Sequence, residues 1–249
     1  MSRAVPFRAV LRSEWTKFWS VRSTWWGTAV YVLVVGATGW LAAAGTDSSP
    51  RADIAVQTAL TGFGIGQLVL VVLGVLAVSS EFASGMALVS MIAVPRRTRL
   101  LVAKTLVVAV YSVLLSAVLA VVCALAARTL TVVPGGVPPG DPDVLRTLLL
   151  QVAAAGLVGV LGVALGAVLR STAGAVGLGT ALVFVAPPVL ALVGSDLAAR
   201  ISQSLPALRV GEDAFLAVAT PWRVGMAVVA AWAVGVWVIG AVLLERRDV

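Results

Sequence analysis

The residues best suited to specific chemistry in this chain are the charged side chains between Ser79 and Lys104. This stretch reads SSEFASGMALVSMIAVPRRTRLLVAK and interrupts a sequence in which only 12% of residues are charged. It opens with an acid, Glu81, directly after a long apolar run, and it ends with four bases: Arg96, Arg97, Arg99 and Lys104. Side chains of both signs at the two ends of one segment suit ion pairing, either within the chain or with a partner surface.

Enzymatic chemistry has few side chains available in this sequence. The chain contains no histidine, and its one cysteine, Cys123, lies in an apolar stretch. Histidine-based catalysis, histidine metal ligands and a disulfide framework are therefore excluded. The apolar segments also hold no pair of carboxylates that would support acid–base catalysis. We expect no catalytic residues, no metal site and no enzyme activity in this chain.

The composition points to a membrane as the main solvent. Hydrophobic residues make up 60% of the chain, and the mean hydropathy is +1.06. Soluble domains carry about 25% charged residues, about twice the share found here. Each membrane crossing needs about 20 apolar residues. The sequence predicts a single all-α integral membrane domain over residues 1–249, with six transmembrane helices at approximately 24–44, 55–79, 101–126, 147–169, 173–193 and 224–244.

The distribution of basic residues predicts the orientation. With six spans, both termini face the same compartment, and that side holds twelve Lys and Arg residues against six on the other. Basic residues collect on the cytoplasmic side of membrane proteins. We therefore expect a multi-pass protein of a bacterial cytoplasmic membrane with both termini and the 80–100 loop in the cytoplasm. The net charge of +7 then reflects topology, and no nucleic-acid partner is expected.

The first 23 residues form a distinct cytoplasmic segment. Aromatic and aliphatic residues recur every three or four positions in FRAVLRSEWTKFWSVR, namely at Phe7, Leu11, Trp15, Phe18 and Trp19. Such a stripe, with basic residues on other faces, predicts an amphipathic helix lying at the lipid surface. The alternative to this helix is a plain basic flank with an aromatic belt. The alternative to a retained first span is a cleavable signal, because Ala42 and Ala44 resemble an A-x-A cleavage site.

Small residues and prolines mark the fourth and fifth spans. Gly156, Gly159, Gly162 and Gly166 recur at spacings of three and four. That pattern lets helix backbones approach closely, either within one subunit or between two subunits. Pro187 and Pro188 predict a kink or local unwinding inside the fifth span. We interpret Gln67 and Gln151 as hydrogen-bonding contacts between helices, or alternatively as substrate contacts.

The charged stretch itself contains a second amphipathic pattern. Phe82, Met86, Val89 and Ile92 follow helical spacing, and Pro95 ends the pattern. Glu81 precedes it and the arginines follow. The pattern predicts a short helix across the cytoplasmic face that docks on a protein or a lipid surface.

Three stretches of the sequence together resemble the ABC-2-type permeases of bacterial, especially actinobacterial, ATP-binding-cassette exporters. They are EWTKFWSVRSTWW near the start, the stretch from Ser79 to Lys104, and the terminal ERRDV. Many such permeases have a glutamate, a Gly-Thr pair, an apolar run, Pro-Arg-Arg and a lysine in the second of these stretches. The matching residues here are Glu81, Gly85, Pro95, Arg96, Arg97 and Lys104. Met86 stands where those permeases have threonine.

The resemblance implies an exporter subunit without an ATPase of its own. In such permeases the segment between the second and third spans is a coupling helix that seats in an ATPase subunit, and residues 81–99 are the candidate here. Glu81 would pair with the ATPase, or with Arg96 or Arg97. The resemblance further implies a second permease copy or a paralogue as a partner, and ATP and Mg²⁺ bound by the ATPase alone. This chain itself has no phosphate-binding GxxxxGK[ST] motif.

The apolar spans favour a hydrophobic or amphiphilic export substrate, such as a drug, antibiotic, peptide or lipid. A non-transporting membrane protein is the alternative: an immunity factor, a sensor partner or an assembly scaffold. A neighbouring gene for an ATPase would favour the exporter.

Overall fold

The fold is a bundle of helices, seen in a computed structural model that describes residues 6–83, 85–86, 97–138, 140–206 and 222–246. Six helical segments in these residues are long and apolar enough to cross a membrane. The chain is therefore of multi-pass membrane type, as its composition predicts. The helices, with a π-helical turn η1, are α1 (Phe7–Ser20), α2 (Arg22–Ala44), α3 (Ala52–Ala59), α4 (Gly62–Ala83), α6 (Arg97–Leu130), α7 (Pro142–Leu169), α8 (Thr172–Thr180), η1 (Ala181–Val185), α9 (Ala186–Val193), α10 (Asp196–Gln203) and α11 (Trp222–Arg246).

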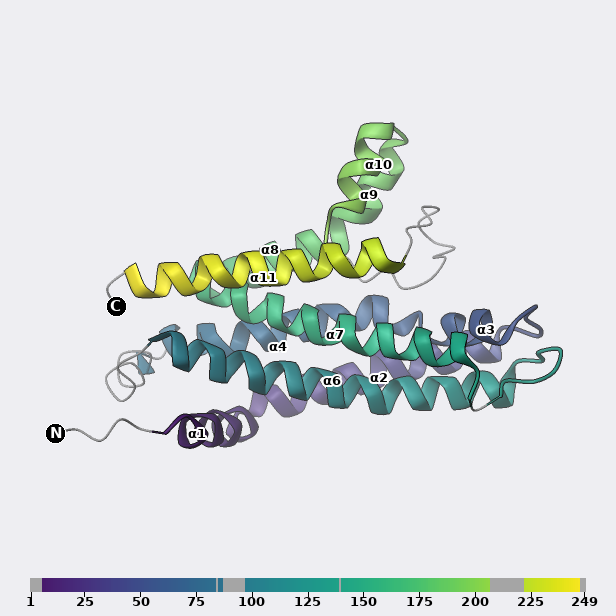
Figure 1. Cartoon of the computed structure of the whole chain (residues 1–249), viewed down its shortest axis with the longest axis horizontal. Coiled ribbons are helices and arrows are strands. Elements are labelled where there is room, and N and C mark those ends of the chain that lie inside the picture. Colours follow the sequence, from purple (N-terminus) through teal and green to yellow (C-terminus); the bar gives the residue numbers. More distant parts are fainter. Residues whose placement is uncertain (1–5, 84, 87–96, 139, 207–221, 247–249) are drawn as a thin grey trace.

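Helix α1, the start of α6 and the end of α11 lie at one end of the bundle, which we call the terminal end (Figure 1). The short helix α3 lies at the opposite end, which we call the α3 end. There the chain before α3 pairs with the chain after α6 through a parallel bridge between Ser48 and Val132. Helix α1 and the end of α11 thus lie at the same end of the bundle, as an even number of crossings requires.

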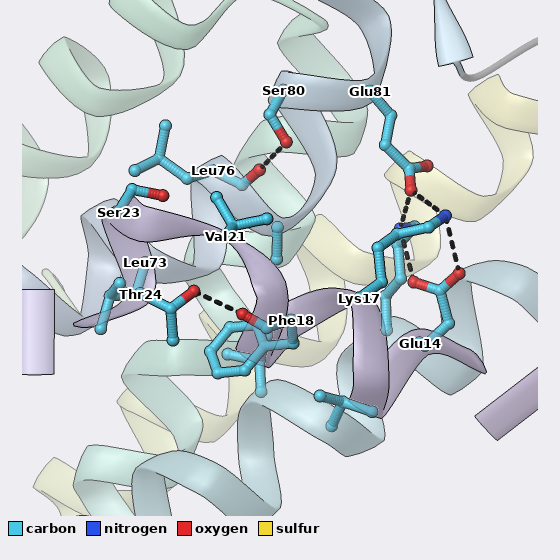
Figure 2. A pocket seen from close by; sticks show the side chains of 14 residues that line it. Glu14, Lys17, Phe18, Val21, Ser23, Thr24, Leu73, Leu76, Ser80 and Glu81 are labelled. Atoms are coloured by element: carbon cyan, nitrogen blue, oxygen red, sulfur yellow. Dashed lines mark hydrogen bonds and ion pairs between the residues drawn. The ribbon is translucent and has the colours of Figure 1, made fainter. Parts of the chain in front are cut away.

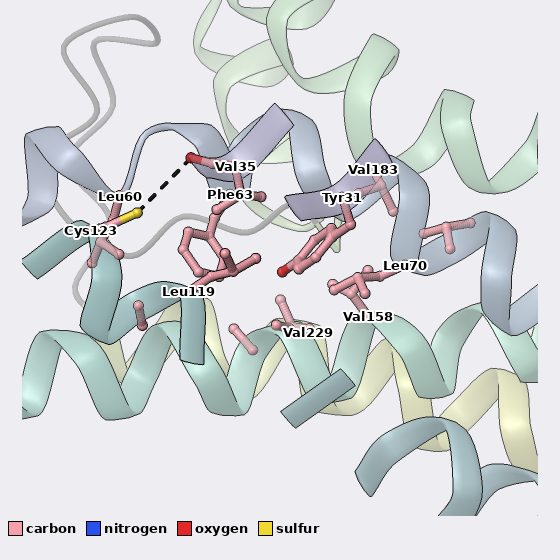
Figure 3. Close-up of a cluster of buried hydrophobic side chains, with 14 of the residues drawn as sticks. Tyr31, Val35, Leu60, Phe63, Leu70, Leu119, Cys123, Val158, Val183 and Val229 are labelled. Carbon is pink, nitrogen blue, oxygen red and sulfur yellow. Dashed lines mark hydrogen bonds between the residues drawn. The ribbon is translucent and has the colours of Figure 1, made fainter. Parts of the chain in front are cut away.

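Helices α4 and α7 form the centre of the bundle, because more of their length is buried than that of the other spans. The largest apolar cluster joins them to α2 and α6 through Tyr31, Phe63, Leu70, Leu119 and Val158 (Figure 3). Tyr31 and Phe63 meet edge to face with their ring centroids 6.2 Å apart. Most of the side chains in this core are aliphatic, so dispersion contacts and close packing hold the bundle together.

The glycines of α7 lie where its backbone approaches its neighbours most closely. A β-carbon built on Gly162 would lie 2.5 Å from the carbonyl oxygen of Val71 in α4, and one on Gly159 would lie 2.6 Å from the hydroxyl oxygen of Ser112 in α6. Gly156 likewise faces α6, and Gly166 faces α4. All four predicted packing glycines therefore serve contacts between helices of the same chain.

The second span begins later than the hydropathy pattern indicates. Residues 55–79 read as one apolar run, but the structure divides this region into α3 and α4 at Leu60 and Thr61. Gly62, the first residue of α4, packs against Val35 and Thr38 of α2. Glycine has low helix propensity, and the turn keeps its apolar residues buried. Hydropathy alone does not predict such a turn, because the apolar run continues through it.

The second and third spans both extend into the charged stretch. Helix α4 continues to Ala83 and α6 begins at Arg97. Glu81 and Arg99 therefore belong to the span helices, whereas the expected loop covered 80–100. Glu81 and Lys104 are both buried.

The fifth span is irregular, as Pro187 and Pro188 predict. A π-helical turn, η1, separates α8 from α9 just before these prolines. Proline lacks an amide hydrogen, so the regular helical hydrogen bonds are interrupted there. Beyond η1, α9 and α10 project away from the other helices (Figure 1). Helix α10 ends at Gln203, before Pro206.

Candidate functional site

Four charged side chains meet at the terminal end of the bundle and form what we call the charge cluster: Glu14, Lys17, Glu81 and Lys104 (Figure 2). The Lys104 ammonium donates to Glu14 Oε2 at 2.6 Å and to Glu81 Oε1 at 2.7 Å. The Lys17 ammonium donates to Glu81 Oε1 at 2.6 Å and to Glu14 Oε1 at 3.3 Å. Each lysine therefore bridges both carboxylates, and the cluster joins α1, α4 and α6.

Helix α1 contributes two members because of its spacing. Val10, Glu14 and Phe18 are four residues apart and form its buried face. Val10 packs with Leu100 and Ala103 of α6, and the ring of Phe18 meets Tyr111 of α6 with centroids 4.9 Å apart. Glu14 is held between these two apolar contacts and faces Lys104. Its carboxylate therefore lies inside the bundle.

The cluster is largely shielded from solvent. The side chains of Glu14 and Lys104 are each 6% exposed and that of Glu81 is 9% exposed, whereas Lys17 is 30% exposed. Charges so buried are stable only when they are paired and hydrogen-bonded. Burial lowers the pKa of Lys17, but its hydrogen bond to Glu81 and the charge of Glu14 outweigh burial, so its pKa is raised overall.

A pocket lies beside the cluster, between α1, α2, α4 and α6. Its charged side is formed by the cluster, and its apolar side includes Leu73, Leu76 and Val107. Figure 2 shows the carboxylate of Glu81 directed toward Lys17, and the hydroxyl of the neighbouring Ser80 donating to the backbone carbonyl of Leu76, one turn earlier in α4. Thr24, also on this wall, donates to the backbone carbonyl of Phe18 at 2.7 Å and fixes the corner between α1 and α2.

Hydroxyl pairs continue the polar contacts from the cluster along α2 and α6. Thr28 and Tyr111 are hydrogen-bonded at 2.5 Å, and Tyr31 and Ser116 at 2.8 Å. The side chain of Ser116 is fully buried. These bonds fix the register of α2 against α6 on the side of the bundle that carries the charge cluster.

The structure brings some of the predicted coupling residues together and leaves others apart. Glu81 and Lys104 are in contact, and Glu81 also pairs within the chain with Lys17. Arg99 is exposed at the start of α6. Gly85 adopts a left-handed backbone with φ of 72°, and Met86 is exposed. Pro95, Arg96 and the Arg97 side chain lie outside the described residues.

Some residues of the predicted interfacial stripe of α1 are buried in the bundle and others are exposed. Phe18 is buried, and Leu11 and Trp19 pack partly against the same cluster of α4 and α6 side chains. Phe7 and Trp15 are exposed. Sequence reasoning missed Glu14 and Lys17 as site residues. The sequence feature that could have identified Glu14 is its spacing of four residues from both Val10 and Phe18, which places a carboxylate on the apolar face of α1.

In the sequence comparisons, no protein-family model and no curated protein matches the chain.

Proposed function

We propose that this chain is the membrane-spanning subunit of an ATP-driven exporter of the ABC-2 type, working with a separate ATPase subunit. Six apolar helices support the membrane-spanning role, and the resemblance of the charged stretch to such permeases supports the family. The excess of basic residues at the terminal end supports a cytoplasmic location for both termini. The exporter would contain a second copy of this chain or a paralogue.

The charge cluster is the observation that carries the proposal. Residues 84–96 link α4 to α6, and Glu81 and Lys104 lie on the two helices that this link joins. The ion pair between them is 2.7 Å long and buried. Movement of the link by an ATPase would therefore reach α4 and α6 together, and Glu14 and Lys17 would carry α1 with them.

The exposed residues around the link are the proposed contact surface for the ATPase. Met86 lies in the link and Arg99 just after it, and both are exposed, so they are available to a partner at the cytoplasmic side. ATP and Mg²⁺ would bind to that partner. Helix α1 would lie along the membrane surface with Phe7 and Trp15 toward lipid headgroups. The apolar side chains that fill the bundle favour a hydrophobic or amphiphilic substrate.

Charge reversal at the two ends of α6 tests this assignment. Arg99 and Arg128 are both exposed on this helix, Arg99 at the terminal end and Arg128 at the α3 end. In proteoliposomes with a candidate ABC ATPase partner, Arg99→Glu should weaken the complex and lower its ATPase rate at least several-fold. Arg128→Glu, the matched control, should leave both unchanged. Equal effects of the two variants, or no complex with the native chain, would reject the proposal.

A further inference from the structure

One side of α1 carries basic and aromatic side chains that take no part in the charge cluster. They follow one another at spacings of four, three and four residues, so they lie along a single face of the helix. The buried face of α1, which packs on α6, lies on a different side. We call the former the basic–aromatic face, and its members are Arg8, Arg12, Trp15 and Trp19.

The aromatic half of this face is directed toward the bilayer. The rings of Trp15 and Trp19 lie 6.1 Å apart between their centroids. Trp19 in turn meets Trp25 at 5.2 Å and Tyr111 at 5.6 Å, and the indole nitrogen of Trp25 donates to the backbone carbonyl of Trp19 at 3.0 Å. Because Trp25 and Tyr111 belong to the span helices α2 and α6, this row of rings lies toward the headgroup region, which indole side chains favour.

The basic half of the face has no anion of its own. Arg8 and Arg12 are one helical turn apart and exposed, and neither forms an ion pair with any described residue. Glu14 is the only acid among residues 1–23, and its carboxylate is bound to the charge cluster on another side of the helix. Two guanidinium groups therefore lie beside exposed indole rings without a counter-charge from their own helix.

The chemistry of the two halves selects a ligand. A guanidinium group binds a phosphate through two parallel hydrogen bonds, and indole rings suit the glycerol and upper acyl chains of a lipid. A zwitterionic lipid carries its own ammonium, which offsets the attraction of its phosphate, whereas a lipid with a net negative charge is attracted to basic side chains at the surface. A soluble phosphate has no acyl chain for the indole rings. An anionic phospholipid satisfies both halves of the face.

We propose that the basic–aromatic face binds an anionic phospholipid, with its phosphate between Arg8 and Arg12 and its glycerol and upper acyl chains against Trp15 and Trp19. The lipid then holds one side of α1 while the charge cluster holds another. This binding rests on the placement of α1 at the membrane surface in the proposed function, and it requires no ATPase.

Brominated lipids, which quench nearby tryptophans, test the choice of lipid. The purified full-length protein is placed in maltoside micelles with equal amounts of phosphatidylglycerol and phosphatidylcholine, and the signal of Trp15 is obtained by comparison with Trp15→Phe. Trp15 should be quenched several-fold more strongly when the bromine is on phosphatidylglycerol than when it is on phosphatidylcholine. Equal quenching by the two lipids would overturn this proposal alone, whereas quenching by neither would also remove α1 from the membrane surface.

A competition experiment separates a lipid from a free phosphate compound. Excess glycerol phosphate carries the same phosphate chemistry without acyl chains, so it should leave the quenching of Trp15 by brominated phosphatidylglycerol unchanged. Loss of the quenching at constant ionic strength would mean that the face binds soluble phosphates, and it would contradict the lipid assignment.

The two arginines provide the matched variants. Arg8→Gln combined with Arg12→Gln should lower the affinity for phosphatidylglycerol about tenfold or more, because each basic residue near an anionic surface adds to the attraction. The control changes Arg51 and Arg128, which are exposed near the α3 end. Arg51→Gln combined with Arg128→Gln should keep the native affinity. Equal losses in the two double variants would reduce the effect to net charge and overturn a binding face on α1.

Discussion

Two parts of the bundle are held together by opposite means. At the terminal end, α1, α4 and α6 meet through the four side chains of the charge cluster, in which three ion pairs measure 2.6 to 2.7 Å. Around the middle of α7, the contact with α4 contains no charged side chain, and Gly74 and Gly162 allow the two backbones to come into contact. The first contact is directional and polar, and the second depends on shape.

The difference indicates separate tasks. Charged groups buried in a membrane protein are costly and are typical of functional positions, whereas small residues between helices are the ordinary means of packing in lipid. The glycine contact therefore suits a fixed centre formed by α4 and α7. The charge cluster suits a place where helices must keep a defined relation to a partner or a ligand.

The largest expected effect comes from removing the cation at the centre of the charge cluster. Lys104→Met leaves Glu14 and Glu81 buried with one cationic partner fewer, so the free energy of unfolding should fall by about 3–5 kcal/mol. Denaturation in mixed micelles measures this change. Adding Glu14→Gln and Glu81→Gln to Lys104→Met should recover much of the loss, because no buried carboxylate then remains and the one lysine left, Lys17, is 30% exposed. A change below about 1 kcal/mol for Lys104→Met alone would show that the cluster is not buried as described.

The glycine contact should respond to a single methyl group. A β-carbon at Gly162 would lie 2.5 Å from the carbonyl oxygen of Val71, an atom of the backbone, so Gly162→Ala should destabilise the protein by about 1–3 kcal/mol. Gly177 in α8 has open space around its β-carbon position. Gly177→Ala is therefore the matched control and should change stability by less than about 1 kcal/mol. Similar losses at both positions would mean that helix contact is not the role of Gly162.

A smaller effect is expected where hydroxyl groups link α2 to α6. Tyr31→Phe removes the hydrogen bond to Ser116 and leaves the Ser116 hydroxyl buried, at a cost of about 1 kcal/mol. A double-mutant cycle with Ser116→Ala isolates this bond, and the double variant should be little worse than Tyr31→Phe alone. Fully additive losses in the cycle would show that the two hydroxyls do not interact.

The smallest effect should come from an ion pair in solvent. Arg146 and Asp143 in α7 lie 3.0 Å apart, but their side chains are 50% and 61% exposed. Arg146→Ala should therefore change the free energy of unfolding by less than about 0.5 kcal/mol, measured by the same denaturation. A loss as large as that of Lys104→Met would mean that burial does not explain the difference between the two pairs.

Hydropathy was enough to predict that six apolar helices exist, because each span is a long run of side chains that belong in lipid. It was insufficient for the ends of α4 and α6, because α4 continues past Glu81 to Ala83 and α6 begins at Arg97, before Lys104. A charged residue usually ends a span, but Glu81 and Lys104 pair with each other between the two helices, and only the tertiary contact reveals that. Pro187 and Pro188 were enough to predict the irregular fifth span, since proline lacks an amide hydrogen whatever its tertiary contacts.

The candidate site was only half predictable for a similar reason. Glu81 and Lys104 stood out as charges beside apolar runs, whereas Glu14 and Lys17 lay in a segment already rich in charges. Their role depends on which face α1 turns toward α6. Val10 and Phe18 determine this face because they pack against apolar side chains of α6. The positions of those side chains in space cannot be read from a single sequence.

The most direct test of the central claim is the affinity of a candidate ABC ATPase partner for two variants of α6 in lipid nanodiscs. Arg99→Glu alters the exposed start of α6 beside the charge cluster, and Arg128→Glu makes the same change at the other end of that helix. We predict at least a tenfold loss of affinity for Arg99→Glu, as expected when an interfacial charge is reversed, and native affinity for Arg128→Glu. Native affinity for both variants, or an equal loss in both, would contradict the assignment of the terminal end as the ATPase contact.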